Sequence, residues 1–257
     1  MAVTSALFAR FLRLGMVAVG VGAIVHEVQA ELHFKPADHV LGDVHPFFHE
    51  GECFLFYLKP GEFRSSLLRS RDLFHWREAE VTHGPPEPDA WMEPWFVLGV
   101  FRDRAEGVYR SFYGTRGGRM VNSVSRDLLH WSCAPKEFHV PPAGYYRRRR
   151  DPFVFWIPPM KRYGCVMTTW MKESGPKETG GAVSLATSDD LRKWTDHGAI
   201  IHPGDMNEPE CRQMFTLGGR WYVLAGIHQG QGEKGGWGSR APWTSTSPLG
   251  PRSLIHI

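Results

Sequence analysis

Three acidic residues of this 257-residue chain stand at the start of apolar, aromatic-rich segments: Asp43, Asp151 and Glu210. An ionised carboxylate is costly to bury without a partner, so one functional cluster explains the three better than separate accidents. Carboxylates that lie together suit general acid–base chemistry, because like-charge repulsion raises the pKa of one acid while another stays ionised. The three acids are therefore the candidate catalytic residues.

A motif that occurs three times, Ser-x-Asp-Leu-x-x-Trp, indicates which elements bring these acids together. The copies begin at Ser70, Ser125 and Ser188, and their aspartates recur after 55 and then 63 residues. A repeat of this kind indicates one supersecondary unit used several times. Ser and Asp favour turns by bonding to nearby backbone amides, and Leu and Trp would pack between units. We predict a structural role for the motif, in the turn between the last two strands of each unit.

Short segments rich in Val, Phe, Tyr and Trp predict the strands of these units. They are Cys53–Leu58, Trp95–Phe101, Val108–Tyr113, Pro152–Ile157, Tyr163–Trp170 and Arg220–Ala225. Several short strands in each period of about 50 residues predict an all-β chain, a β-propeller with one four-stranded blade per period. The innermost strand of each blade lines a central channel, where acids at the strand starts would converge.

The ordered motifs resemble those of the five-bladed propeller glycosidases, namely glycoside hydrolase family 32 with its relatives in families 43, 62 and 68. The resemblance rests on His33-Phe34-Lys35-Pro36 followed by Gly42-Asp43, on Arg150-Asp151-Pro152, on Glu210-Cys211 and on the Asp-Leu-x-x-Trp turn. It covers about residues 31 to 250.

The resemblance implies a role for each acid. Asp43 would be the nucleophile, Asp151 would bind sugar hydroxyls and stabilise the transition state, and Glu210 would be the acid/base. Arg150 would pair with the acids and orient them. The further substrate-binding candidates are His45, Trp91, Glu93 and Glu208. The implied reaction is hydrolysis of furanosides, above all β-fructofuranosides of the sucrose, inulin or levan type, by a retaining double displacement.

Several alternatives stay open. Gly42 stands where the invertase motif has Asn, which favours as a second hypothesis a family 43-like α-L-arabinofuranosidase or β-xylosidase that inverts, with Asp43 activating water. A third hypothesis is a non-catalytic carbohydrate-binding propeller. Glu208 is the rival of Glu210 as acid/base. Trp91 suits packing between blades as well as sugar binding, and His45 suits a structural role.

The composition of the chain excludes some classes of partner and cofactor. A net charge of +3 is too small to indicate nucleic-acid binding, and the isolated Arg147–Arg150 run does not change that interpretation. The four cysteines and 13 histidines lack metal-ligand spacing, so we predict no catalytic metal and no cofactor. Cys53 and Cys165 lie in apolar strand segments and are predicted to be free, buried thiols.

The chain is predicted to consist of a signal peptide over residues 1–30 and a propeller domain over residues 31–257. Arg10 and Arg13 precede an apolar run, and small residues stand where a signal peptidase cleaves after Ala30. This predicts a secreted or periplasmic protein without membrane association after cleavage; the alternatives are an uncleaved anchor or a misassigned start codon.

The repeats predict about four blades, with the fifth missing. A variant of the turn motif lies near Pro248, and the remaining residues are too few for another blade. An open propeller exposes sheet surface, so we expect reduced stability or closure by homodimerisation, unless four blades close by themselves.

Overall fold

The described part of the molecule belongs to a unit that runs from His33 to Ile257. The computed structural model describes residues 34–59, 65–84, 99–114, 120–133, 146–172, 180–204, 206–228, 237–239 and 243–245. The predicted signal peptide, together with Trp91 and Glu93, lies outside the described residues. No helix in the described ranges is long and apolar enough to cross a membrane.

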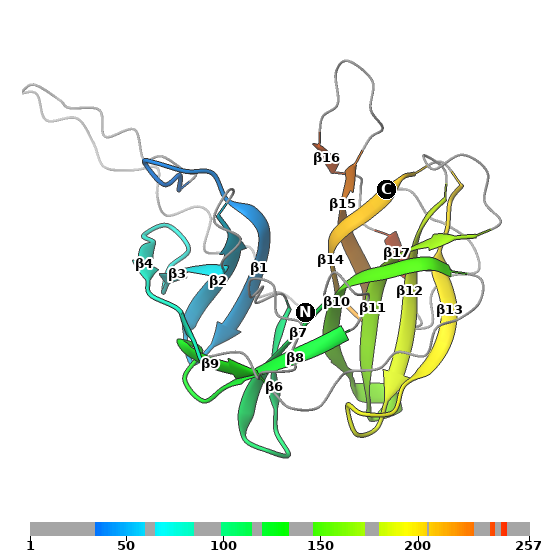
Figure 1. Cartoon of the computed structure of the whole chain (residues 1–257), viewed down its shortest axis with the longest axis horizontal. Coiled ribbons are helices and arrows are strands. Elements are labelled where there is room, and N and C mark those ends of the chain that lie inside the picture. The colour runs from blue at the N-terminus through cyan, green and yellow to red at the C-terminus, as the bar shows by residue number, and fades with distance from the viewer. Residues whose placement is uncertain are drawn as a thin grey trace, which may run out of the picture. The chain divides into compact units, whose positions relative to one another are not determined.

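Within these ranges the chain forms four sheets, antiparallel except for the pairing of β5 with β9, here called blades 1 to 4 (Figure 1). Blade 1 is β1 (Gly42–His49), β2 (Glu52–Leu58), β3 (Ser65–Ser70) and β4 (Arg77–Ala79). Blade 2 is β6 (Val100–Asp103), β7 (Val108–Gly114), β8 (Met120–Ser125) and β9 (His130–Cys133), and β5 (Thr82–His83) pairs with β9 in parallel.

Blades 3 and 4 follow the same order along the chain. Blade 3 is β10 (Tyr146–Ile157), β11 (Arg162–Met171), β12 (Gly181–Ser188) and β13 (Thr195–Ile201), with the short 3₁₀ helix η1 (Pro158–Met160) after β10. Blade 4 is β14 (Glu208–Leu217), β15 (Arg220–His228), β16 (Trp237–Ser239) and β17 (Trp243–Ser245), the last two both paired with β15. The predicted all-β propeller with about four blades is confirmed.

The repeated motif forms the turn before the last strand of blades 1, 2 and 3, as predicted. In the second copy the Asp127 carboxylate accepts hydrogen bonds from the amides of Leu129 and His130, at 2.9 and 2.8 Å. Leu128 has a φ of 70°, which is unusual for a residue other than glycine. The turn is held because Leu128 N–H donates to Ser125 Oγ at 2.9 Å, while the Trp131 indole donates to Leu128 O at 3.0 Å. The first and third copies repeat this geometry, so the motif has the predicted structural role.

The core lies between successive blades, and the turn motif contributes to it. Trp131 of blade 2 packs edge-on against Phe56 of blade 1, with ring centroids 6.0 Å apart. Trp194 of blade 3 packs in the same way against Phe112 of blade 2, at 6.5 Å. Burying one such ring stabilises the fold by roughly 1.5–3 kcal/mol. The Leu and Trp of the second and third copies therefore pack between blades as expected, whereas Leu73 of the first copy is exposed.

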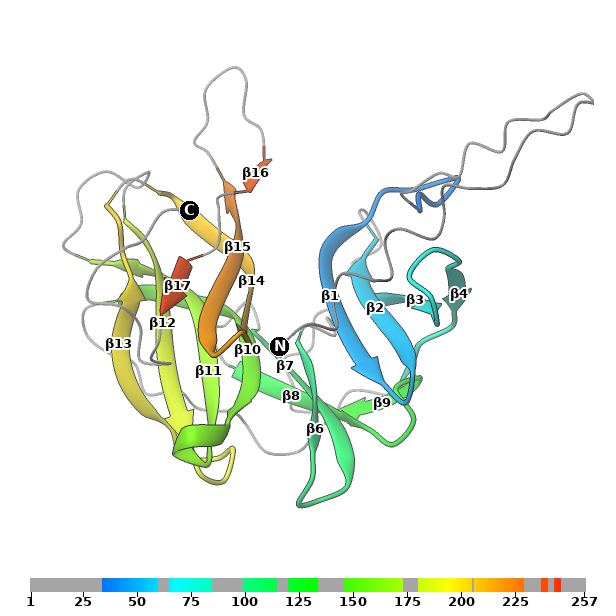
Figure 2. The same cartoon turned by 180° about the vertical axis from the view of Figure 1, so that it is seen from behind.

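The first strands of the four blades contact one another around a common axis. β1 contacts β6, β6 contacts β10, β10 contacts β14, and β14 contacts β1. Viewed from either side, β14 runs next to β10 and β11 (Figure 2). The predicted acids lie on three of these innermost strands, β1, β10 and β14. The topology therefore brings residues that are more than 160 positions apart in the sequence to one axis.

Gly181 fixes the segment that leads into β14. Its amide donates to Met206 O at 2.9 Å, and a Cβ at this position would lie 1.8 Å from the carbonyl oxygen of Asn207. Gly181→Ala is therefore expected to displace this segment and destabilise the protein by about 1–3 kcal/mol, as overpacking of a core does. Urea unfolding measures the loss. Gly84→Ala is the control, because its Cβ would find its nearest neighbour at 3.6 Å; equal stability of the two variants would contradict the prediction.

Candidate active site

Each innermost strand that carries a predicted acid has a β-bulge at that acid or next to it. The pairing register shifts between Gly42 and His45, between Arg150 and Phe153, and between Glu210 and Gln213, so that two residues face one on the neighbouring strand. The first residue of each bulge has a positive φ: 46° at Asp43, 49° at Asp151 and 48° at Cys211. Such backbone strain costs about 1–3 kcal/mol per residue and persists at sites that function requires. Asp43, Asp151 and Cys211 are therefore equivalent positions of three blades, and Glu210 precedes the third.

Cys211 links blade 4 to Asp43 of blade 1. Its thiol donates to Asp43 Oδ1, with a sulfur–oxygen distance of 2.9 Å. Burial, followed by the nearby negative charge of Asp43, raises the pKa of the Cys211 thiol. The thiol therefore stays protonated at neutral pH and serves as a hydrogen-bond donor to the carboxylate. The sequence motif that contains Cys211 did not predict this contact with Asp43.

Arg150 pairs with two of the acids. Its Nη2 contacts Glu210 Oε1, and its Nη1 lies 3.8 Å from Asp151 Oδ2. The guanidinium also lies 6.0 Å from the ring centroid of Trp170. Glu210 and Asp151 are thus held on the two sides of one planar cation, and the Glu210 side chain is only 12% exposed.

Arg212, which sequence reasoning missed, lies behind Asp151. Its side chain is fully buried, and its Nη2 lies 3.5 Å from Asp151 Oδ2. The sequence did contain a signal: an arginine that follows Glu-Cys in an apolar strand raises the same burial problem as the acids. Two acids and two arginines of blades 3 and 4 thus form one charged network, which consists of Arg150, Asp151, Glu210 and Arg212.

His45 is buried beside this network. The side chain is 3% exposed, and neither ring nitrogen has a hydrogen-bond partner among the described residues. Its ring stacks on Phe153 with centroids 6.5 Å apart. Burial, together with the positive charge of Arg212, lowers the pKa of His45 to about 4, although Asp151 opposes the shift. The imidazole is therefore neutral at neutral pH.

The low pKa of His45 predicts acid sensitivity. The group titrates near 6.5 when unfolded and near 4 when folded, so its contribution to stability is complete above pH 6.5 and is lost as the pH falls towards 4. The loss amounts to about 3 kcal/mol at pH 4. His45→Gln should flatten the dependence of the urea midpoint on pH between 6.5 and 4. A slope identical to that of the wild type would contradict the assignment.

The remaining predicted substrate-binding residues are placed only in part. Glu208 is the first residue of β14, two positions before Glu210, and its side chain lies outside the described part of the structure. Trp91 and Glu93 are outside the described residues altogether. Their roles, and the choice between Glu208 and Glu210 as acid/base, stay predictions.

One group of side chains away from the network has the composition of a metal site. Donor atoms of Asp38, His39 and Glu78 lie within 4.8 Å of one another. Both ring nitrogens of His39 already have partners, Asp38 Oδ1 at 2.6 Å and the Tyr57 hydroxyl at 2.9 Å. Lys59 lies 3.9 Å from Asp38 and would compete with a cation.

All four cysteines are free thiols, as predicted for Cys53 and Cys165.

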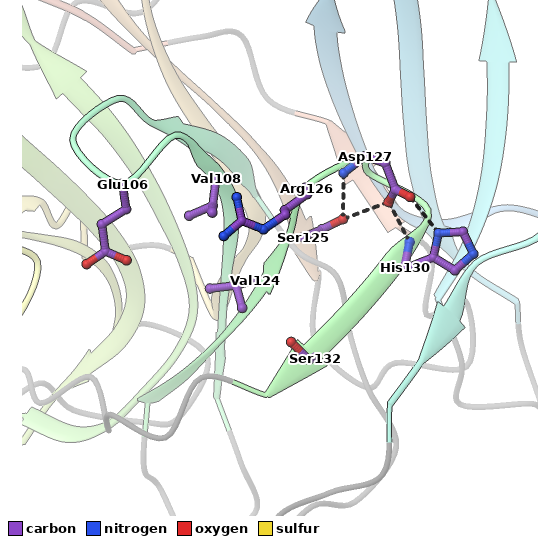
Figure 3. Close-up of a pocket in the computed structure, with 8 residues that line it drawn as sticks. All are labelled: Glu106, Val108, Val124, Ser125, Arg126, Asp127, His130 and Ser132. Carbon is purple, nitrogen blue, oxygen red and sulfur yellow. Dashed lines mark hydrogen bonds and ion pairs between the residues drawn. The ribbon is translucent and has the colours of Figure 1, made fainter.

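A hollow of about 440 Å³ lies at the outer strands of blade 2, beside the second turn motif (Figure 3). Its lining residues are Glu106, Val108, Val124, Ser125, Arg126, Asp127, His130 and Ser132. Both carboxylates of the hollow already have structural partners: Asp127 accepts hydrogen bonds within the turn, and Glu106 forms an ion pair with Arg110. We therefore place the candidate active site at the innermost strands, where Cys211 and Arg150 connect the strands that carry the three acids.

Comparisons with known proteins address the fold. No protein-family model and no curated protein sequence matches the chain. Among solved structures, a family 32 β-fructofuranosidase of Bombyx mori matches with a TM-score of 0.57 and 18% identity over 79% of this chain. An inulosucrase of Halalkalicoccus jeotgali bound to kestose matches with a TM-score of 0.60 and 18% identity over 82% of the chain. A thermostable family 43 glycoside hydrolase matches with a TM-score of 0.63 and 13% identity over 84%.

These matches differ in how much of the solved structure they cover. The chain spans 46% of the Bombyx mori enzyme, 66% of the inulosucrase and 72% of the family 43 hydrolase. At such low identity the likeness concerns the fold. The chain has the fold of the propeller glycosidases of families 32 and 43.

Proposed function

We propose that this chain is a glycoside hydrolase that cleaves furanosides, with β-fructofuranosides of the sucrose, inulin or levan type as substrates. The observation that carries the proposal is the placement of Asp43 and Asp151 on strained bulges of two innermost strands, with Glu210 directly before the bulge of a third. Side chains of neighbouring blades hold each acid. The solved structures that share the fold, a β-fructofuranosidase and an inulosucrase bound to kestose among them, support the substrate class.

In the proposed reaction Asp43 attacks the anomeric carbon while Glu210 protonates the leaving oxygen. The covalent glycosyl–Asp43 intermediate is then hydrolysed by a water molecule that Glu210 deprotonates, so the product keeps its configuration. Asp151 hydrogen-bonds sugar hydroxyls and stabilises the positive charge of the transition state. Arg150, in contact with Glu210 and near Asp151, keeps both oriented.

A second candidate function is an inverting α-L-arabinofuranosidase or β-xylosidase, with Asp43 activating water instead of attacking. Gly42 before Asp43, and the match to a family 43 hydrolase, favour it. The third candidate is a carbohydrate-binding propeller without turnover. It requires that the three acids serve only to bind sugar.

One screen separates the candidates. Sucrose, inulin, levan and an aryl arabinofuranoside are incubated with the protein, and the first product anomer is followed by NMR. Release of fructose with retained configuration supports the main proposal, and an inverted pentose supports the second. Sugar binding by wild type and by Asp43→Asn, with no turnover on any substrate, would establish the third.

We further propose export and self-association. Amino-terminal sequencing of the protein recovered outside the cytoplasm should begin at Glu31, and an intact Met1 in that fraction would contradict signal cleavage.

The proposed homodimer is tested by light scattering, which should give twice the mass of one chain. A monomer at micromolar concentration would contradict the dimer.

A further inference from the structure

Arg212 is the largest side chain that is completely buried among the described residues. Burial lowers the pKa of its guanidinium, with the nearby carboxylate of Asp151 opposing the shift. A buried cation persists in a fold only where its partners compensate the loss of water. The identity of those partners therefore indicates what the residue does.

The hydrogen-bond and ion-pair partners of Arg212 lie at or beside the bulges of blades 3 and 4. Its Nε donates to Pro209 O at 3.3 Å, and its Nη1 donates to Arg150 O at 3.2 Å and to Asp151 O. Its Nη2 lies 3.5 Å from the Asp151 carboxylate. Asp151 is thus held at both its backbone carbonyl and its side chain by one guanidinium.

We propose that Arg212 is a positioning residue that holds the strained backbone of Asp151 and fixes its carboxylate at the centre of the candidate active site. The assignment rests on the proposed function, in which Asp151 binds the sugar. A left-handed conformation at a residue other than glycine needs surrounding contacts to maintain it, and Arg212 makes two of them.

Arg212 and Arg150 both lie near the Asp151 carboxylate, and Arg212 also donates to the Asp151 carbonyl. Arg150 is directed to Glu210 and lies 3.8 Å from the Asp151 carboxylate. His45, which also faces Asp151 and Arg212, is neutral above its low pKa of about 4. A lysine at position 212 would keep the charge, but its single nitrogen cannot reproduce a planar fork that reaches three carbonyls and a carboxylate.

The test compares Arg212→Ala and Arg212→Lys with Arg110→Ala as the matched control. Arg110 is also a largely buried arginine with carboxylate partners, Asp103 and Glu106, but it lies in blade 2 outside the site. On the substrate found by the screen, Arg212→Ala and Arg212→Lys should lose about 100-fold in kcat/KM, the order expected when a reacting group is displaced by an ångström. Methylguanidinium added at millimolar concentration should restore activity to Arg212→Ala and leave Arg110→Ala and wild type unchanged.

Crystal structures provide a readout that does not depend on activity. In Arg212→Ala the Asp151 carboxylate should leave its position, and soaking with methylguanidinium should return it. Should Arg212→Ala not fold, Arg212→Met fills the same space without charge and takes its place in the kinetic and crystallographic comparison.

The outcomes separate this inference from the proposed function. Folded Arg212 variants with kcat/KM within threefold of wild type, or with Asp151 unmoved in the crystal, would overturn the positioning role. A wild-type protein that cleaves no glycoside would overturn the proposed function, while the crystallographic comparison would still decide whether Arg212 positions Asp151.

Discussion

Replacing Glu210 with glutamine is expected to lower kcat on an unactivated fructoside by about 10²–10⁴-fold, the usual contribution of a general acid. The amide has the shape of the carboxyl group and can still accept a hydrogen bond from Arg150, which contacts Glu210 in the wild type. It has no proton of suitable acidity to give to the leaving oxygen. The variant should therefore fold normally and bind substrate while losing the step that breaks the glycosidic bond.

The loss of activity in Glu210→Gln should depend on how readily the leaving group departs. An aryl glycoside whose phenolate leaves without protonation should be cleaved by Glu210→Gln with a much smaller loss than sucrose shows. Glu208→Gln is the matched control, since it removes a carboxylate two residues away on the same strand. A large loss in Glu208→Gln, with activity retained in Glu210→Gln, would transfer the acid/base role to Glu208.

Much of the architecture could be predicted because the repeat is a local signal. The Ser, Asp and Trp of each motif copy bond within four residues of themselves, so their arrangement follows from spacing alone. Apolar segments such as Tyr163–Trp170 could be predicted as strands because their enrichment in apolar and aromatic residues is also a local signal. β12 (Gly181–Ser188) was missed because its small residues, all buried between β11 and β13, show neither alternation nor aromatic enrichment.

The detailed site could be predicted only in part, because its contacts join residues that are distant in sequence. Asp43 and Cys211 are 168 positions apart, and no spacing rule connects them. The bulges depend on how each strand pairs with its neighbour, which a single strand sequence does not specify. Arg212 acquires most of its partners through the bulge of another blade. The acids were identified because an isolated carboxylate at an apolar strand is itself unusual.

The strained bulges and the buried charges suggest why the site needs a rigid framework. Three residues with a φ between 46° and 49° each cost stability, and the fully buried Arg212 adds a desolvation cost. Packing of Trp131 and Trp194 between blades offsets such costs away from the axis. The turn motif, which takes no part in the chemistry, thus helps to maintain the geometry on which the chemistry depends.

The largest effect is expected for Asp43→Ala, which should reduce kcat by at least about 10³-fold, as loss of a covalent nucleophile does. The change removes the group that attacks the anomeric carbon and leaves Glu210 and its contact with Arg150 in place. It also removes the acceptor of the Cys211 thiol, which remains protonated because its pKa is raised. Asp38→Ala, which removes an exposed aspartate just before the same strand, should keep the activity of the wild type.

Azide discriminates the two proposed mechanisms in this variant. The small anion can enter the space left by the Asp43 carboxylate and attack the anomeric carbon, while Glu210 protonates the departing group. A retaining enzyme should then yield a glycosyl azide of inverted configuration from Asp43→Ala, and one of retained configuration from Glu210→Gln acting on an activated aryl glycoside. If the wild type instead releases an inverted product and azide forms no adduct in the Glu210 variant, Asp43 activates water and never becomes glycosylated. Near-normal turnover by Asp43→Ala without azide would remove Asp43 from the mechanism altogether.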